Sequence, residues 1–98
     1  MTITDIRILL VDDPRLKAFA AVTFDHVFVV KGLKVILGNS DHLFLAMPSR
    51  KRPSGQYQDI VHPIHQAFRN VLEEAVLLEY SRWLRAEAQS SRDFHRGS

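Results

Sequence analysis

The first two-thirds of the chain alternate apolar and polar residues with a period of two, which is typical of strands that bury one face. Residues 3–11 show this alternation, and residues 16–24 show it again after a turn at Pro14. One face of the second stretch would carry Leu16, Ala18, Ala20, Val22 and Phe24. The small alanines on this face indicate that another element packs closely against it.

Residues 27–37 continue the strand pattern and are rich in β-branched and aromatic side chains. They follow Asp25 and His26, which predict a tight hairpin turn. Gly32 interrupts the run, and an isolated glycine inside a strand pattern predicts a bulge or a kink.

The next part of the chain predicts two more strands on either side of a polar loop. A turn over residues 38–41 leads into a strand over residues 42–47, and Pro48 ends it because proline has no N–H for the strand ladder. The loop reverses direction at Gly55, and residues 57–60 would then form one short strand.

After residue 63 the apolar period changes from two to 3.6, which predicts a helix. His62 would cap this helix and Pro63 would take its first position, where a missing N–H costs nothing. The stripe that faces the sheet would consist of Ile64, Ala67, Phe68, Val71, Leu72, Ala75 and Leu78. A second apolar set lies on another side of the C-terminal half and consists of Val76, Tyr80, Trp83 and Leu84. We expect the helix to fray between Arg85 and Gln89.

These elements predict an α+β fold, with a small antiparallel β-sheet of five to six strands followed by one C-terminal α-helix. A single domain would span residues 1–88, and residues 89–98 would form a flexible tail. One helix of about 25 residues covers only part of such a sheet. We therefore predict a homodimer, which would hide an edge strand and cover the second apolar set on the helix.

The composition narrows the cellular setting. The 98 residues include no cysteine, which excludes disulfides and thiolate zinc sites and agrees with a reducing compartment. The N-terminus lacks the pattern of a signal peptide, and no apolar run approaches the roughly 18 residues that a membrane-spanning helix needs. We expect a cytoplasmic protein with no membrane partner.

The net charge of +2 is too small to indicate a nucleic-acid-binding protein, but the cations are clustered. Arg50, Lys51 and Arg52 are adjacent, and Tyr57 follows shortly after them. Such cations can follow phosphate oxygens, and an aromatic ring can stack on an unpaired base. Composition alone favours a second interpretation, a solvated turn whose charges have no ligand.

Arginines on the helix are weaker candidates. Arg82 and Arg85 lie where the helix dipole favours positive charge, and pairing with Glu79 or Glu73 would explain them without a ligand. Only a face shared with the basic loop would make a helix arginine part of a binding site. Arg69 is the nearest to the loop in sequence and is the first choice.

No pattern indicates catalysis or a bound metal. His62 and His65 are three residues apart, but there is neither a His-Glu-x-x-His motif nor a cysteine beside them. Nucleophile elbows, phosphate-binding loops and dinucleotide-binding glycine patterns are absent from the sequence. We therefore expect a protein that is not an enzyme and has no cofactor, no metal site and no catalytic residues.

One extended motif resembles the SpoVG family, the stage V sporulation protein G or septation-regulator proteins of bacteria. The resemblance covers about residues 1–84, and its most specific part is the Ala-Met-Pro-Ser-Arg-Lys run over residues 46–51. At a fixed distance after this run come Gly55, Asp59, Ile60, His62, Pro63 and Ile64. His42 departs from the pattern, since relatives often have glycine before the Leu-Phe pair, which leaves the shape of the 38–42 turn open.

The resemblance implies a small antiparallel sheet with a C-terminal helix that dimerises through strands. It also implies binding of DNA and RNA in the regulation of gene expression and, in sporulating relatives, of septation. Arg50 and Lys51 match the two basic positions that follow Met-Pro-Ser, so they are the strongest site candidates, ahead of Arg52, Tyr57 and Arg69.

Two functions remain open at this point. The first is a homodimeric DNA- and RNA-binding regulator in which two copies of the basic loop form one positive surface, with phosphate contacts supplying most of the affinity. The alternative is a protein–protein interaction module of the cell-division or sporulation machinery that does not bind nucleic acid. It would use Val76, Tyr80, Trp83 and Leu84 together with an exposed sheet edge.

Overall fold

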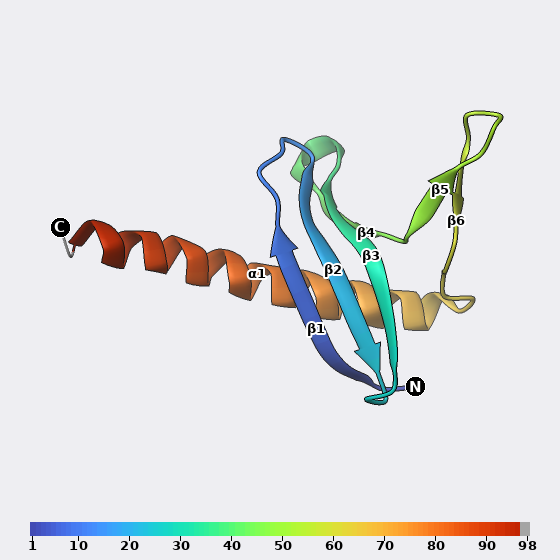
Figure 1. Ribbon diagram of the computed structural model, residues 1–98, viewed down its shortest axis with the longest axis horizontal. Coiled ribbons are helices and arrows are strands. Elements are labelled where there is room, and N and C mark those ends of the chain that lie inside the picture. The colour runs from blue at the N-terminus through green and yellow to red at the C-terminus, as the bar shows by residue number, and fades with distance from the viewer. Residues whose placement is uncertain (97–98) are drawn as a thin grey trace.

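Two antiparallel sheets and one long helix make up the fold (Figure 1). The computed structural model describes the backbone of residues 1–96 and the side chains of residues 1–88. The elements run in the order β1 (Ile3–Leu10), β2 (Leu16–Phe24), β3 (Phe28–Leu37), the 3₁₀ turn η1 (Asn39–Asp41), β4 (Leu43–Ala46), β5 (Ser49–Lys51), β6 (Tyr57–Asp59) and α1 (Gln66–Arg96). The predicted α+β class, six strands followed by a C-terminal helix, is confirmed.

The strands are divided between two sheets rather than gathered in the single sheet that the sequence predicted. The larger sheet has the order β1-β2-β3-β4, and β5 and β6 pair separately. The hairpin turn between β2 and β3 forms as predicted, with Asp25 and His26 at φ 52° and 59° and the Val27 N–H bonded to the Phe24 carbonyl at 3.0 Å. In the turn before β2, the N–H groups of Leu16 and Arg15 donate to the Asp13 carboxylate and hold its pKa below the usual value.

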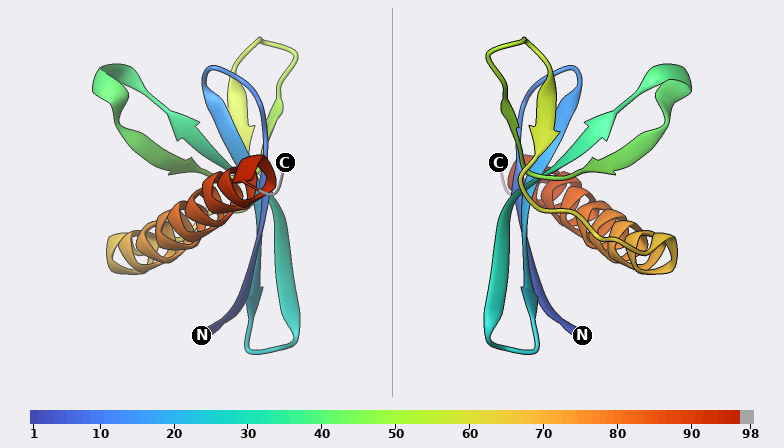
Figure 2. Two further views of the ribbon diagram at one scale, coloured as in Figure 1. Left: turned by 90° about the vertical axis from the view of Figure 1, so that its left-hand side faces the viewer. Right: turned by 90° about the vertical axis from the view of Figure 1, so that its right-hand side faces the viewer.

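The inner face of the four-stranded sheet is the core face that the alternation in β2 predicted. Ala18, Ala20, Val22 and Phe24 are buried there, and they are joined by Leu33 and Val35 of β3 and Leu45 of β4. Ile6, Ile8 and Leu10 of β1 pack against this cluster at its edge. The helix α1 lies across the same face, contacts β1 and β4, and so closes the core (Figures 1 and 2).

A bulge at Gly32 changes the phase of β3, as the sequence predicted. Ala20 pairs with Leu33 and Val22 pairs with Val30, so β3 holds one more residue than β2 over this interval. Val30 and Leu33 therefore both lie on the core side although they are three residues apart. Gly32 has φ +81°, a conformation that side chains disfavour, and a Cβ placed on it would lie 3.6 Å from the Cβ of Pro48.

The helix begins later than predicted. Its first backbone hydrogen bond runs from the Arg69 N–H to the His65 carbonyl at 3.1 Å, so Gln66 is the first helical residue and His62 is not the cap. Pro63 lies in the segment before the helix. Its fixed φ fits an extended backbone as well as a first helical turn, so the proline alone did not mark where the helix begins. Ile64, placed by the sequence on the buried stripe, is 83% exposed.

The helix packs through a narrow i, i+4 row. Leu72, Val76 and Tyr80 are buried and Phe68 is partly buried against the core. Phe68 and Leu72 were predicted correctly, but Val76 and Tyr80 were assigned to the wrong set. The predicted stripe was too wide, and its members that remain exposed are Ile64, Ala67, Val71 and Leu78.

The helix also extends further than predicted, to Arg96 instead of fraying between Arg85 and Gln89. The stretch after Arg85 contains no proline, and its first glycine is Gly97, while its alanines are strong helix formers. Residues 81–88 are all exposed, so the helix leaves the sheet after Tyr80 (Figure 1). The side chains of residues 89–98 lie outside the described part, and the predicted flexibility of this tail stays a prediction.

The projecting elements give the molecule an elongated shape. Its radius of gyration is 15.4 Å, whereas a compact domain of this length would have a radius of about 13 Å. In the described part of the chain, no helix combines the length and the apolar character that crossing a membrane would require.

A hydrogen bond between the helix and the sheet edge fixes how α1 crosses β4. The Leu45 N–H donates to the Glu73 carboxylate at 3.0 Å, in partly buried surroundings. Leu45 also contributes a buried side chain to the core, so one residue holds the helix through its backbone and fills the core with its side chain. Glu73 therefore bonds the sheet edge. Among the described side chains it does not form the ion pair with a helix arginine that the sequence had suggested.

Replacing Glu73 should destabilise the fold. Glu73→Ala leaves the Leu45 N–H without its acceptor, and we expect a loss of about 1 to 2 kcal/mol in the free energy of unfolding. Urea unfolding followed by circular dichroism measures this loss. Glu74→Ala is the matched control because Glu74 is exposed. Equal midpoints for the two variants would show that the hydrogen bond contributes nothing.

Candidate nucleic-acid interface

The predicted basic loop is a two-stranded ribbon, which we call the β5–β6 ribbon (residues 49–59). In its register Ser49 pairs with Asp59, Arg50 with Gln58 and Lys51 with Tyr57. Arg50 and Lys51 are therefore strand residues, and only Arg52 lies at the turn. The predicted polar loop begins only after Lys51, and the strand before it was missed because three residues are too few to show a period of two.

The ribbon ends in a tight turn whose residues suit their positions. The Arg52 N–H donates to the Gln56 carbonyl at 2.7 Å, and the Gly55 N–H donates to the Arg52 carbonyl at 2.9 Å. Pro53 sets the φ of the second turn position, and Gly55 has φ +91°. This arrangement matches a three-residue hairpin loop in which a glycine forms the bulge.

The ribbon projects from the body of the molecule (Figures 1 and 2). Residues 50–59 are all exposed, and β5 and β6 pair with each other rather than with the larger sheet. At its base the Ile60 N–H donates to the Pro48 carbonyl at 2.7 Å, which joins the two ends of the ribbon. The predicted site residues are thus presented on an arm that leaves both faces accessible.

Strand alternation separates the adjacent cations onto the two faces of the ribbon. Lys51 lies opposite Tyr57 on one face, and Arg50 lies opposite Gln58 on the other. Tyr57 is 71% exposed, so its ring is available for stacking. In the part of the chain with described side chains, none of the ribbon's cations takes part in an ion pair.

Arg69 lies beside the ribbon. A shared surface of this kind was the condition for counting a helix arginine as part of the site. Arg69 lines a hollow of about 400 Å³ together with Tyr57, Gln58, Asp59 and His62. The start of α1 and the base of the ribbon therefore share one polar surface. Asp59 is the acidic group there, so the positive charge of the ribbon is concentrated toward its tip.

The other helix arginines lie away from the ribbon. Arg82 pairs with Glu79 at 3.8 Å, which confirms that its charge has a partner on the helix itself. Arg85 is exposed on the part of the helix that projects beyond the sheet, far from the ribbon (Figure 1). Neither arginine shares a surface with the predicted site.

The second apolar set on the helix, which was predicted to form a dimer or partner interface, has two buried and two exposed members. Val76 and Tyr80 are only 0% and 6% exposed against the sheet of their own chain, and burial raises the pKa of the Tyr80 hydroxyl. They offer no surface to a partner, so their assignment to an interface was wrong. Trp83 and Leu84 are each 49% exposed on the projecting helix and remain candidates.

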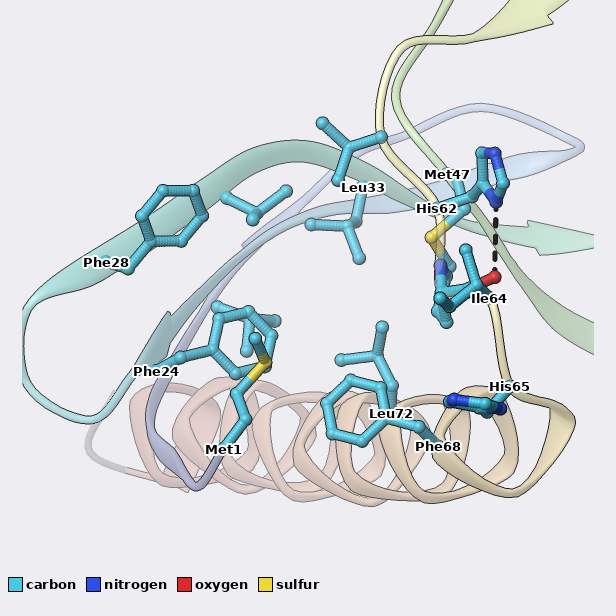
Figure 3. A pocket seen from close by; sticks show the side chains of 14 residues that line it. Met1, Phe24, Phe28, Leu33, Met47, His62, Ile64, His65, Phe68 and Leu72 are labelled. Carbon is cyan, nitrogen blue, oxygen red and sulfur yellow. Dashed lines mark hydrogen bonds between the residues drawn. The ribbon is translucent and has the colours of Figure 1, made fainter.

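An apolar cavity that the sequence did not predict lies between the sheet and the start of the helix (Figure 3). It has a volume of about 400 Å³. Phe24, Phe68 and the exposed Phe28 of β3 all line it, and the rings of Phe24 and Phe68 have centroids 6.0 Å apart. Its walls come from distant segments of the chain, which is why no single stretch of sequence indicated it.

His62 and His65 both line this cavity. The His62 Nδ1 lies 3.2 Å from the Pro63 carbonyl, so this ring nitrogen is engaged with the backbone (Figure 3). Among residues whose side chains are described, no three histidine, aspartate or glutamate side chains gather in a way that could hold a metal ion.

Comparisons with known proteins agree on one family. A model of the SpoVG family matches residues 1–82. A relative in Myxococcus xanthus is 46% identical over 84 residues, which cover 86% of this chain and 84% of the relative. A relative in Caldanaerobacter subterraneus subsp. tengcongensis is 52% identical over 83 residues, which cover 84% of this chain and 90% of the relative. Both carry the name "Putative septation protein SpoVG".

The independence of the ribbon can be measured by hydrogen exchange. We expect the Arg52 N–H to exchange at least about 10-fold faster than the bonded N–H groups at the centre of β2, because opening a ribbon that packs on no other strand requires less free energy. Amide exchange followed by NMR makes the comparison within one sample. Equal protection would mean that the ribbon opens only when the whole domain unfolds.

Proposed function

This chain belongs to the SpoVG family, and on that premise we propose that it is a bacterial DNA- and RNA-binding regulator that acts in gene expression and in the control of septation or sporulation. The observation that supports this most is the exposed ribbon, on which Arg50, Lys51 and Arg52 lie together without carboxylate partners among the described side chains. A cytoplasmic location, where its ligands are found, is part of the proposal.

The position of the charge matters more here than its total. A net charge of +2 gives only weak long-range attraction to a polyanion, but cations on a projecting arm can approach phosphates closely. Phosphate contacts position a protein on nucleic acid without reading its sequence. Lys51 and Arg69 would supply such contacts from the tip and the base of the ribbon.

Tyr57 gives the same arm a way to bind single strands. Its exposed ring lies on the face that also carries Lys51, so a base could stack on the ring while the ammonium group contacts a neighbouring phosphate. Stacking of this kind is tolerant of sequence and works for RNA and DNA alike. A single arm would therefore serve both kinds of nucleic acid.

A homodimer is the second part of the proposal. Trp83 and Leu84 are half exposed on a helix that projects beyond its own sheet, and large apolar side chains in that position favour contact with another chain. Two copies would double the number of ribbons. A dimer that neutralises about four to six phosphates would give a salt dependence of log K with a slope of roughly −4 to −5 on duplex DNA.

The apolar cavity beside Phe28 and Ile64 favours a second candidate function. Both side chains are more than half exposed next to an apolar hollow, which suits an interaction module that binds another protein of the division machinery. In that case the ribbon's charge would have no ligand. The two functions are separated by whether binding of nucleic acid depends on the ribbon.

Removing two ribbon cations should weaken nucleic-acid binding. For Arg50→Ala with Lys51→Ala we expect at least a 10-fold loss of affinity for duplex DNA at low salt and a shallower salt slope, because phosphate contacts are lost. Fluorescence anisotropy titrations at several salt concentrations measure both quantities.

Arg7→Ala with Arg15→Ala is the matched control, since it removes the same charge from exposed side chains of β1 and of the turn that follows it. Duplex DNA, single-stranded DNA and RNA are titrated in parallel. Unchanged affinity of the ribbon variant for all three, or an equal loss in the control, would reject the ribbon as the binding site and favour the interaction module.

Dimerisation is tested on the exposed part of the helix. We expect the wild-type chain to sediment as a dimer at tens of micromolar, and Trp83→Ala to weaken the dimer about 10-fold or more, because a large aromatic side chain at an interface contributes strongly. Val71→Ala, exposed on the sheet-covered half of the helix, is the control. A wild-type protein that sediments only as a monomer would contradict the proposed homodimer.

A further inference from the structure

One face of the β5–β6 ribbon carries an unusual set of side chains. Arg50 pairs with Gln58, and the Arg52 N–H bonds to the Gln56 carbonyl. Because side chains alternate along each strand, these four residues lie on the face opposite Lys51 and Tyr57. All four are exposed, and the face carries two arginines, two glutamines and no carboxylate.

This composition matches the chemistry of base edges. An arginine can donate two hydrogen bonds to the O6 and N7 atoms of guanine, and a glutamine can bond both N6 and N7 of adenine. Phosphates accept hydrogen bonds from amides as well as from cations, so phosphate binding alone does not call for a particular pairing of the two. Each Arg–Gln pair instead offers one group suited to guanine and one suited to adenine.

The shape of the ribbon fits the groove in which these atoms lie. The major groove of B-form DNA is about 12 Å wide and accepts a two-stranded ribbon, whose strands lie about 4.8 Å apart. The minor groove, about 6 Å wide, is too narrow for it. The ribbon stands clear of the larger sheet, so its tip can enter a groove before the body meets the backbone (Figures 1 and 2).

We propose that the β5–β6 ribbon reads base edges in the major groove of duplex DNA through Arg50, Arg52, Gln56 and Gln58. This rests on the proposed nucleic-acid binding and adds the ligand and the residues that select it. Lys51 lies on the other face, away from the groove floor, and Arg69 lies at the base of the ribbon, where it would contact a phosphate of the groove wall. Double-stranded RNA is excluded as a ligand of this face because its major groove is too deep and narrow.

The test is a selection with the full chain from duplex DNA that has a randomised 12-base-pair core. Affinities are then measured for the selected duplex, for a shuffled duplex of equal composition, and for the selected duplex with 7-deaza purines. The deaza bases remove only the N7 acceptor of the major groove and keep the base pairing and the phosphates. We expect wild type to prefer the selected duplex at least 10-fold and to lose most of this preference on the deaza duplex.

Gln56→Ala with Gln58→Ala is the decisive variant because it leaves the charge unchanged. We expect its preference for the selected duplex to fall about 5-fold or more, while its affinity for the shuffled duplex stays within 2-fold of wild type. Gln66→Ala, a glutamine on the helix that bonds Asn70, is the control and should retain the wild-type preference. Melting curves verify that each variant is folded.

The outcomes separate this inference from the function on which it rests. If the glutamine variant keeps the full preference, if the deaza duplex binds as well as the normal one, or if wild type selects no sequence, the ribbon face does not read bases although nucleic-acid binding stands. The same conclusion follows if wild type shows an equal preference for the selected sequence as a single strand. If the Arg50→Ala, Lys51→Ala variant binds the shuffled duplex as wild type does, the proposed function itself fails.

Discussion

The extra residue at Gly32 decides which side chains of β3 reach the core. Before the bulge Val30 faces inward, and after it Leu33 and Val35 do, while Lys34 is kept on the other side of the sheet. Without the change of phase a lysine would compete with valine and leucine for the core, at a large cost in desolvation. The same glycine lies against Pro48, where the chain leaves the sheet, so one bulge sets both the packing of β3 and the point from which the ribbon starts.

The sequence predicted those parts of the fold in which the local pattern is long. The nine residues of β2 were placed with their observed bounds, and the bulge in β3 was placed at its glycine. The helix was found, but its start and its packed row were misplaced. A proline before a helix is compatible with several backbone conformations, and a helix with apolar residues on most sides does not reveal which row the sheet will cover.

The candidate site was predicted by residue type and not by geometry. The cluster of Arg50, Lys51 and Arg52 and the proximity of Arg69 were correct expectations about where the cations lie. Their distribution over two faces depends on the pairing of two three-residue strands, and such short strands carry too little pattern to be recognised. The apolar cavity depends on contacts between distant segments, which no local pattern contains.

The hydrogen bond from Leu45 to Glu73 also affects how copies of the chain could add to one another. A sheet that offers two free edges can accept a strand on each side and grow without limit, as fibres do. Here the β4 edge already donates an N–H group to the helix, and β1 is the remaining edge of the four-stranded sheet. Pairing through β1 alone would be satisfied by a single second copy, so an anchored β4 edge would favour closed assemblies over open-ended ones.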